Sequence, residues 1–316
     1  MGRKNAKFRL AIWSVVTVVL ISLFVGGLSS RHDDYGIFNV IQIGGIGNSS
    51  KNLNKINEWT IKTDNLKDIR VDLTVDYVVI RTTEEKDMKI VESSNYKLSE
   101  KEKLKISEES KDVKIYRNHD ILSGLSFGRN KTRRLDIYIP ETYKANLYVD
   151  NNVGDIDVLS NLNLDQFSIS LDVGDLSIEG DISCNNFSAK SSTGNIEASI
   201  INTKQYDIKS SVGDIDCTGL SGKGTIKAST GDINCGIDRI DGNINIDSKV
   251  GDVEVRVADG LSFELDAKCS VGDLDSDFPI TTSKKNGKEV MASVGENGSS
   301  TMKIKANIGD IDISKK

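Results

Sequence analysis

The chain has 316 residues, of which 37% are apolar and 27 are glycines, so it carries enough apolar side chains to bury a core. It has only 2 histidines, His32 and His119, which argues against a histidine-built metal centre and a Ser-His-Asp hydrolase. The formal net charge is −6, and residues 150–316 hold 28 acids against 16 lysines and arginines, so a nucleic acid partner is not expected.

The N-terminus has the pattern of a membrane signal anchor. Residues 1–9 carry four basic side chains and no acid, and residues 10–28 form an uncharged, mostly apolar stretch. About 20 apolar residues span a bilayer as a helix, and a basic flank stays in the cytoplasm. The alternative is a cleaved secretory signal, although the apolar stretch is longer than usual and Leu28-Ser29-Ser30 is a poor cleavage site. We expect a single-pass cell-membrane protein with its C-terminal part extracytoplasmic, following a stalk or linker at residues 29–58.

Residues 59–149 show strand alternation in an irregular form. Ile69, Val71 and Leu73 alternate with polar residues, and Asp76-Tyr77 stands where a Gly-Asp pair stands in later segments. Period-two alternation is typical of β-strands. The region is interpreted as irregular N-terminal β coils or a cap on the edge of the following repeats, with a separate small β-domain as the alternative.

A short phrase, typified by Val-Gly-Asp-Ile-Asp, recurs eight times in residues 150–316. Its glycines are spaced by 20, 20, 19, 18, 20, 21 and 37 residues, and the last interval predicts an extra coil with an insertion near residues 283–300. Such a period indicates a repeat architecture in which each coil stacks on its neighbours. The expected corner glycines are Gly154, Gly174, Gly194, Gly213, Gly231, Gly251, Gly272 and Gly309.

Apolar residues alternate before each glycine and resume in a new phase after it, which predicts two short strands joined at a glycine bend. The predicted fold is therefore all-β, a single-stranded β-solenoid (β-helix) of about 20-residue coils, preceded by one N-terminal transmembrane α-helix. Two inward columns are expected. One holds Val153, Val173, Thr193, Val212, Thr230, Val250, Val271 and Ile308, and the other holds Ile156, Leu176, Ile196, Ile215, Ile233, Val253, Leu274 and Ile311.

Three features of the sequence resemble those of a known protein family. The stretch 135–140, the Val-Gly-Asp-Ile phrases and the ending 298–314 are similar to the bacterial "putative adhesin" domain family, a β-solenoid of unknown function with repeated Gly-Asp-Ile phrases. The resemblance covers roughly residues 60–314. It implies surface exposure and adhesion, and many members are tethered to the membrane or accompany cell-envelope stress systems. It implies no catalytic residue.

The residue after each glycine is acidic in seven of the eight phrases. In stacked coils these carboxylates form a ladder that a hard cation such as calcium, or a cationic peptide, could bind. The simpler interpretation is that each aspartate caps a turn with its own side chain. The candidate cation ladder comprises Asp155, Asp175, Asp214, Asp232, Asp252, Asp273 and Asp310.

The four cysteines lack a Cys-x-x-Cys spacing, so neither a zinc ribbon nor a redox dithiol is expected. Cys217 and Cys235 share one repeat position and are expected to be buried thiols, because in-register parallel strands suit a disulfide poorly. No catalytic or cofactor-binding residue is predicted.

The leading hypothesis is a non-enzymatic surface module for adhesion, envelope interaction or stress protection, with an envelope polymer, a cationic peptide or a membrane protein as partner. The alternative is a regulatory accessory of an envelope-sensing system, acting through a membrane partner. A polysaccharide-acting enzyme is third, because the carboxylates are spread evenly along the repeat.

Overall fold

The computed structural model describes residues 53–118, 131–279, 282–284, 288–296 and 298–316. Every regular element in these ranges is a β-strand, which agrees with the all-β prediction. No helix in these ranges is long and apolar enough to cross a membrane. The predicted basic tail, anchor and most of the stalk lie outside the described residues.

The strands fall into three groups along the chain. The N-terminal group is β1 (Asn54–Lys62), β2 (Asp68–Val75), β3 (Tyr77–Thr83), β4 (Asp87–Ser94), β5 (Lys105–Glu109), β6 (Asp112–Tyr116) and β7 (Arg133–Pro140). The regular group is β8 (Asn146–Val153), β9 (Ile156–Val158), β10 (Leu162–Val173), β11 (Leu176–Ile178), β12 (Ile182–Thr193), β13 (Ile196–Val212), β14 (Ile215–Thr230), β15 (Ile233–Val250) and β16 (Val253–Val257). The final group is β17 (Phe263–Val271), β18 (Leu274–Ser276), β19 (Thr282–Lys284), β20 (Glu289–Val294), β21 (Thr301–Ile308) and β22 (Ile311–Lys315).

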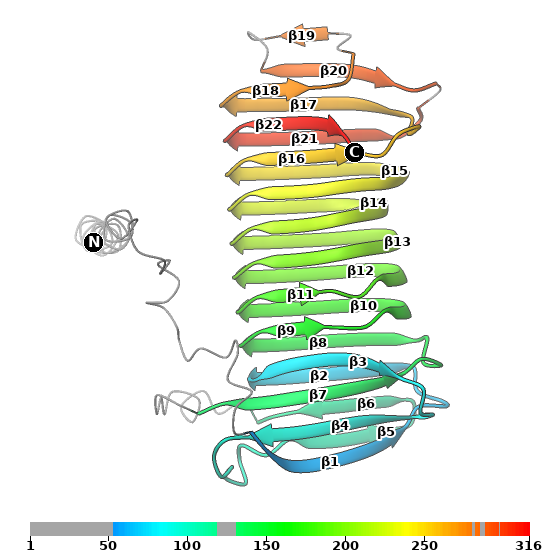
Figure 1. The fold of residues 1–316 in the computed structure, drawn as a ribbon, viewed down its shortest axis with the longest axis vertical. Coiled ribbons are helices and arrows are strands. Elements are labelled where there is room, and N and C mark those ends of the chain that lie inside the picture. The colour runs from blue at the N-terminus through cyan, green and yellow to red at the C-terminus, as the bar shows by residue number, and fades with distance from the viewer. Residues whose placement is uncertain (1–52, 119–130, 280–281, 285–287, 297) are drawn as a thin grey trace, which may run out of the picture. The chain divides into compact units, whose positions relative to one another are not determined.

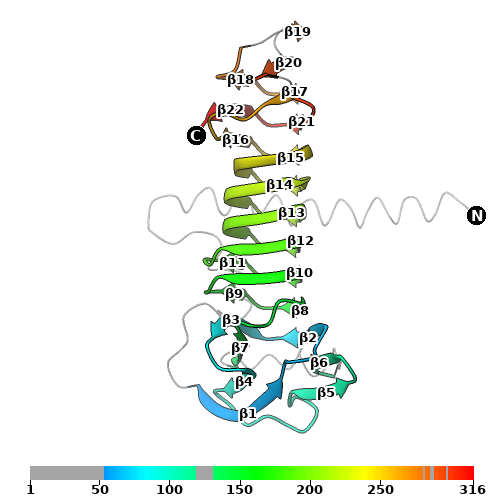
Figure 2. The same ribbon diagram turned by 90° about the vertical axis from the view of Figure 1, so that its right-hand side faces the viewer.

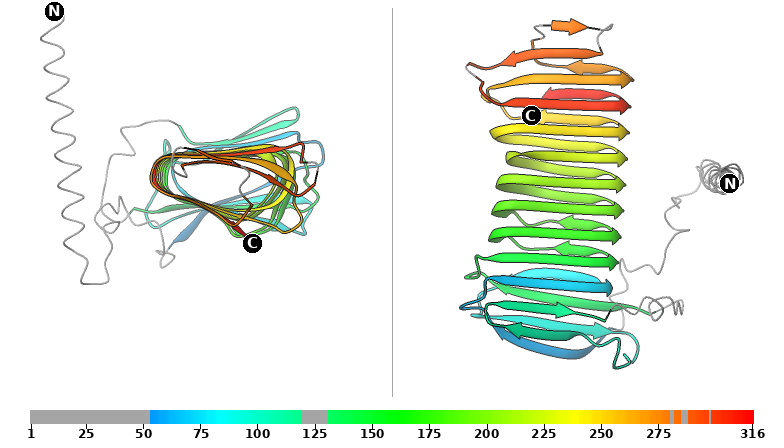
Figure 3. Two further views of the ribbon diagram at one scale, coloured as in Figure 1. Left: turned by 90° about the horizontal axis from the view of Figure 1, so that it is seen from above. Right: turned by 180° about the vertical axis from the view of Figure 1, so that it is seen from behind.

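The regular strands stack in parallel and in register, as a solenoid requires (Figure 1). Each coil has two sides that meet at the Gly-Asp bend, here called the corner. The long face contains the strand segments that run into the corner, such as β8, β10 and β12. The short face contains the segments that leave it, such as β9 and β11. Seen along the stack, the two faces enclose a flattened interior (Figure 3).

The interior is filled by the apolar residues of both faces. The predicted short-face column is correct, because Ile156, Ile196, Ile215 and Ile233 are fully buried and only Leu274, near the end of the stack, is half-buried. On the long face, Phe167 and Phe187 stack edge-to-face from coil to coil with their ring centroids 6.0 Å apart. Apolar columns that continue through successive coils make each coil dependent on its neighbours for burial.

The other predicted inward column is wrong. The residue before each corner glycine points outward, and Val212 is 51% exposed and Val271 59% exposed. The last side chain to face inward is that of the residue three before the glycine, as Leu171 shows. The chain then bends, so two consecutive side chains lie outside the turn.

The coils do not stack in chain order at the C-terminal end. The last interval also holds antiparallel strands in place of the predicted extra coil. β21 pairs with β15 on one side and with β17 on the other, and β22 lies likewise between β16 and β18. The final coil is therefore inserted between two earlier ones, as the colours of Figure 1 show. The preceding segment forms β19 and β20, which pair antiparallel with each other, and β20 also pairs antiparallel with β17.

The N-terminal end has a similar crossing. The coil made by β2 and β3 pairs with β8 and β9 on one side and with β6 and β7 on the other. The antiparallel strands β1, β4 and β5 follow beyond it (Figure 2). Both ends of the stack thus finish in antiparallel strands, which cover the open edges of the parallel coils.

Candidate functional site at the Gly-Asp corner

The corner glycines are required by backbone geometry and by close packing. Gly174, Gly194, Gly213 and Gly231 have φ between +131° and +141°, a region that side chains with a Cβ rarely adopt. A Cβ on Gly213 would also stand 2.2 Å from the carbonyl oxygen of Gly194 in the neighbouring coil. In the regular coils, a side chain at this position would therefore collide with the backbone of the neighbouring coil.

The aspartates after these glycines form one continuous row, so the structure brings all seven predicted ladder residues together. In each case Oδ1 accepts a hydrogen bond from the backbone N–H of the equivalent residue in the next coil. The oxygen–nitrogen distances are 3.0 Å for Asp155 to Asp175, 2.7 Å for Asp175 to Asn195, 3.0 Å for Asn195 to Asp214, 2.8 Å for Asp214 to Asp232, 2.8 Å for Asp232 to Asp252, 2.8 Å for Asp252 to Asp310, and 2.8 Å for Asp310 to Asp273.

The row corrects the idea that each aspartate caps its own turn, because the N–H that is capped belongs to the next coil. Asn195 performs the same task through its amide oxygen, so the bond does not depend on a negative charge. Burial raises the pKa of Asp155, and the N–H of Asp175 opposes that shift only in part. The primary role of the row is to fasten coil to coil.

Cation binding by the row stays a prediction. Within the described ranges, no group of three or more His, Cys, Asp or Glu side chains is placed to hold a metal ion. One oxygen of each ladder residue before Asp273, the last of the row, is already a hydrogen-bond acceptor. A rise in melting temperature on adding millimolar calcium, beyond that given by sodium chloride at the same ionic strength, would support a cation site.

A buried ion cluster in the N-terminal coils was not predicted from the sequence. Arg117, which is 1% exposed, donates from Nε and Nη2 to the two carboxylate oxygens of Asp76 at 2.8 Å and 2.7 Å. Its Nη1 also donates to Glu92 Oε1 at 2.6 Å. Arg133 donates from Nη2 to the carbonyl oxygen of Val75 at 2.7 Å. A signal was present, since strand alternation in β4 places Glu92 on the same side as Met88 and Ile90.

The cluster replaces the Gly-Asp corner in the coil of β2 and β3. Asp76 lies opposite Gly154, since its neighbours Val75 and Val78 pair with Val153 and Ile156. Burial lowers the pKa of Arg117, but Asp76 and Glu92 outweigh it and hold that pKa above its ordinary value. A guanidinium that stays protonated and buried does not serve as a general acid or base, so the cluster ties β2, β4 and β6 together.

The four cysteines are free thiols, as expected for Cys217 and Cys235. These two are register partners on β14 and β15 and are fully buried. Burial raises the pKa of Cys235 to about 12 and that of Cys217 higher still. Neither is a nucleophile at neutral pH.

Two shallow depressions lie beside the β7–β8 turn. The one of about 530 Å³ is bordered by Glu141, Asn161 and Asp181, and the one of about 510 Å³ by Asp64 and Asp165. Tyr143 contributes to both, and its hydroxyl donates to the carbonyl oxygen of Asn146 at 2.6 Å. Both are open and mostly polar, unlike the apolar concave pockets typical of small-molecule sites.

Comparison with known proteins confirms the resemblance inferred from the repeated phrases. A family described as Toastrack DUF4097 matches residues 66–314. No curated protein matches the chain. The chain is similar to the crystal structure of a "putative cell adhesion protein" from Clostridium sporogenes, with 16% identity, a TM-score of 0.30, and coverage of 84% of this chain and 100% of that chain.

Two further solved structures are similar. A "putative adhesin" from Bacteroides fragilis has 16% identity and a TM-score of 0.45, and a "putative lipid binding protein" from Parabacteroides distasonis has 13% identity and a TM-score of 0.47. In each case the match covers 84% of this chain and 98% of that chain.

Proposed function

The chain belongs to the Toastrack DUF4097 family, and from that premise we propose that it is a non-enzymatic binding and structural module of the cell envelope. Residues 10–28 anchor it in the membrane, and the stacked coils lie on the extracytoplasmic side. The single observation that carries the proposal is the repetition of outward positions, coil after coil, as in the row from Asp155 to Asp273. A surface with equivalent groups at each strand spacing suits an extended partner better than a small substrate.

Enzymatic action is a weaker candidate, because the side chains of the aspartate row are held by hydrogen bonds to the backbone. Each acceptor oxygen, such as Oδ1 of Asp214, is fixed on an N–H of the next coil. Glycoside hydrolysis needs one protonated and one ionised carboxyl group facing a bound sugar. A uniform row gives equivalent positions rather than two different ones.

Binding is tested with the purified full-length chain and isolated cell envelopes. We expect the folded chain to sediment with the envelopes, the heat-unfolded chain to be lost from that fraction, and no soluble sugar ends to be released. Sedimentation no greater than that of an unrelated acidic protein would contradict the binding function. Release of sugar ends would favour an enzyme instead.

Topology is tested by adding protease to intact cells or spheroplasts. The region after Ser30 should be digested, because the basic flank should retain the N-terminus inside. A fully protected C-terminus would overturn the orientation. Recovery of a soluble form starting near Ser30 would replace the anchor with a cleaved signal.

A further inference from the structure

A row of lysines follows the long face of the regular coils. Five of the eight repeats carry lysine four residues before the corner glycine. Three of these are direct register partners on adjacent coils, because Lys190 pairs with Lys209 and Lys209 pairs with Lys227. These three residues are here called the lysine ladder. Asp247 follows Lys227 in the same row and ends the uninterrupted stretch.

The ladder carries more positive charge than its surroundings neutralise. Adjacent strands lie about 4.8 Å apart, and like charges directly opposite each other destabilise a sheet. Lys209 forms an ion pair with Asp207 at 2.7 Å. Within the described part of the chain, Lys190 and Lys227 have no ion pair, and both are exposed. Lys227 has Asp247 as its register partner, so three cations have two neighbouring carboxylates.

Some lysines elsewhere in the sheet form ion pairs across strands. Lys303 and Asp266 are register partners, with Nζ 3.6 Å from the carboxylate, and Lys114 reaches Asp72 on the neighbouring strand diagonally, with Nζ 3.0 Å from that carboxylate. Cross-strand pairing is the ordinary way to place charged residues on a sheet. Like charges also stand opposite each other at Lys268 and Lys305, but the ladder is a run of three.

Hydroxyl groups border the ladder on both sides. The outward position two residues closer to the corner holds Ser192, Ser211 and Ser229 in the same three coils. On the other side, Ser188 and Thr225 are the register neighbours of Asp207. Ammonium groups bind phosphate oxygens as point charges, and hydroxyl groups donate hydrogen bonds to them.

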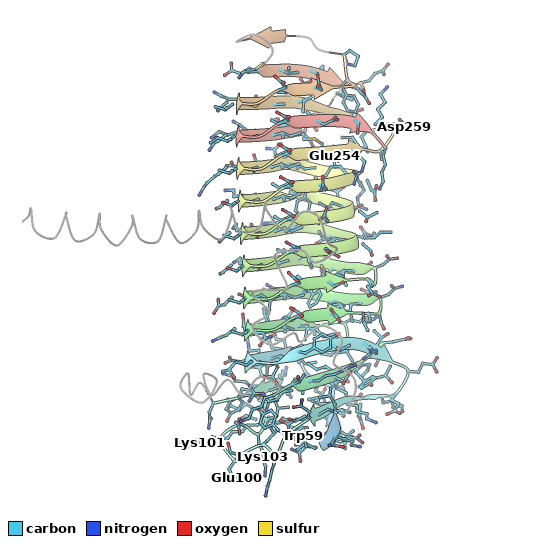
Figure 4. The ribbon with its side chains drawn as sticks, turned by 60° about the vertical axis from the view of Figure 1, so that its left-hand side comes forward. Trp59, Glu100, Lys101, Lys103, Glu254 and Asp259 are labelled. Carbon is cyan, nitrogen blue, oxygen red and sulfur yellow. The ribbon has the colours of Figure 1, made fainter. Side chains whose placement is uncertain are left out.

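The short face and the long face differ in charge, and this difference determines which face an anion can approach. The outward positions of the short face include Glu197, Asp216 and Glu254, the last labelled in Figure 4, beside the row of corner aspartates. These carboxylates repel an anion, whereas the ladder attracts it. An anionic partner would therefore lie along the long face and run parallel to the axis of the stack.

We propose that the lysine ladder binds a linear polyanion with phosphate groups along its backbone. The ladder lies on an open sheet face, so a small anion would touch only one or two lysines, whereas a polymer engages all three and displaces their counterions. The proposal rests on the proposed envelope-binding function and names the chemistry of its partner.

The test uses the purified full-length chain in a neutral detergent and long-chain polyphosphate as the probe. Binding should weaken steeply with added salt, and the triple variant Lys190→Gln, Lys209→Gln, Lys227→Gln should bind at least tenfold more weakly. The matched control is Lys86→Gln, Lys111→Gln, Lys144→Gln, which removes the same charge from three exposed turns and should bind as the parent does. Asp247→Asn should strengthen binding, because it joins the ladder to Lys305.

Three results would overturn the proposal. Equal weakening in both triple variants would show that only net charge matters. Equal displacement by monomeric glycerol phosphate at the same phosphate concentration would show that the occupant is a single phosphate group and not a polymer. If the triple lysine-ladder variant still sedimented with the envelopes, the lysine ladder would not be the binding site, and the proposed function would stand. Loss of sedimentation by the parent chain would instead remove the proposed function, even if polyphosphate still bound.

Discussion

Replacing one corner glycine measures how closely the coils depend on that position. Gly213 lies in the middle of the regular stack, has φ of +132°, and donates its N–H to the carbonyl oxygen of Thr230 at 2.9 Å. Gly213→Ala adds one methyl group at the point where the carbonyl oxygen of Gly194 lies 2.2 Å away. That carbonyl belongs to backbone held on both sides by parallel pairing, so it cannot turn aside cheaply.

The expected loss has two parts. A backbone conformation that is almost confined to glycine costs about 1–3 kcal/mol when a Cβ is present. Relief of the contact needs a local shift of two coils, and overpacking of this kind costs about 1–3 kcal/mol more. We therefore expect Gly213→Ala to lower the free energy of unfolding by about 4 kcal/mol.

Gly260→Ala is the matched control, because Gly260 has φ of +78° and nothing lies within 4 Å of its added Cβ. A left-handed conformation alone costs about 1–2 kcal/mol for a non-glycine residue. Urea unfolding followed by far-ultraviolet circular dichroism compares the two variants with the parent. The packing argument for the corner would be refuted if Gly213→Ala were no more destabilising than Gly260→Ala.

Further substitutions test the row, the core, the ion cluster and the thiols. Asp214→Ala should cost about 1 kcal/mol in urea unfolding and Asp214→Asn less than about 0.5, because asparagine keeps the acceptor oxygen; equal losses would show that charge matters. Ile215→Asp should cost several kcal/mol by burying an unpaired charge, and a mild effect would contradict the inward assignment. Arg117→Met should cost about 3–5 kcal/mol, because two carboxylates lose their buried partner, and a small loss would show that water enters the cluster. Cys217 and Cys235 should resist iodoacetamide at pH 8 and after a rise to pH 10, since burial raises the pKa of both above that range; mass spectrometry showing rapid labelling of the folded chain would contradict their burial.

The candidate site was predictable in part. Repetition of the aspartates at one phase of the repeat was enough to place them in a single row, because equal phase means equal position on stacked coils. Their hydrogen-bond partners were not predictable, since a side chain that caps its own turn and one that caps the next coil give the same repeat. Arg117 was missed for a related reason: its partners Asp76 and Glu92 are 41 and 25 residues away in sequence.

The sequence by itself determined the all-β class, the coil length and the inward column that includes Ile215 and Ile233, because period-two alternation and a recurring phrase are local properties of the chain. Only the tertiary structure decided that the valines before the glycines face outward, since the bend interrupts the alternation where the pattern still reads as continuous. It also decided that the coil of Gly309 lies between those of Gly251 and Gly272. Every repeat phrase offers the same strands to any other, so stacking order depends on connection lengths and on the antiparallel strands that close each end.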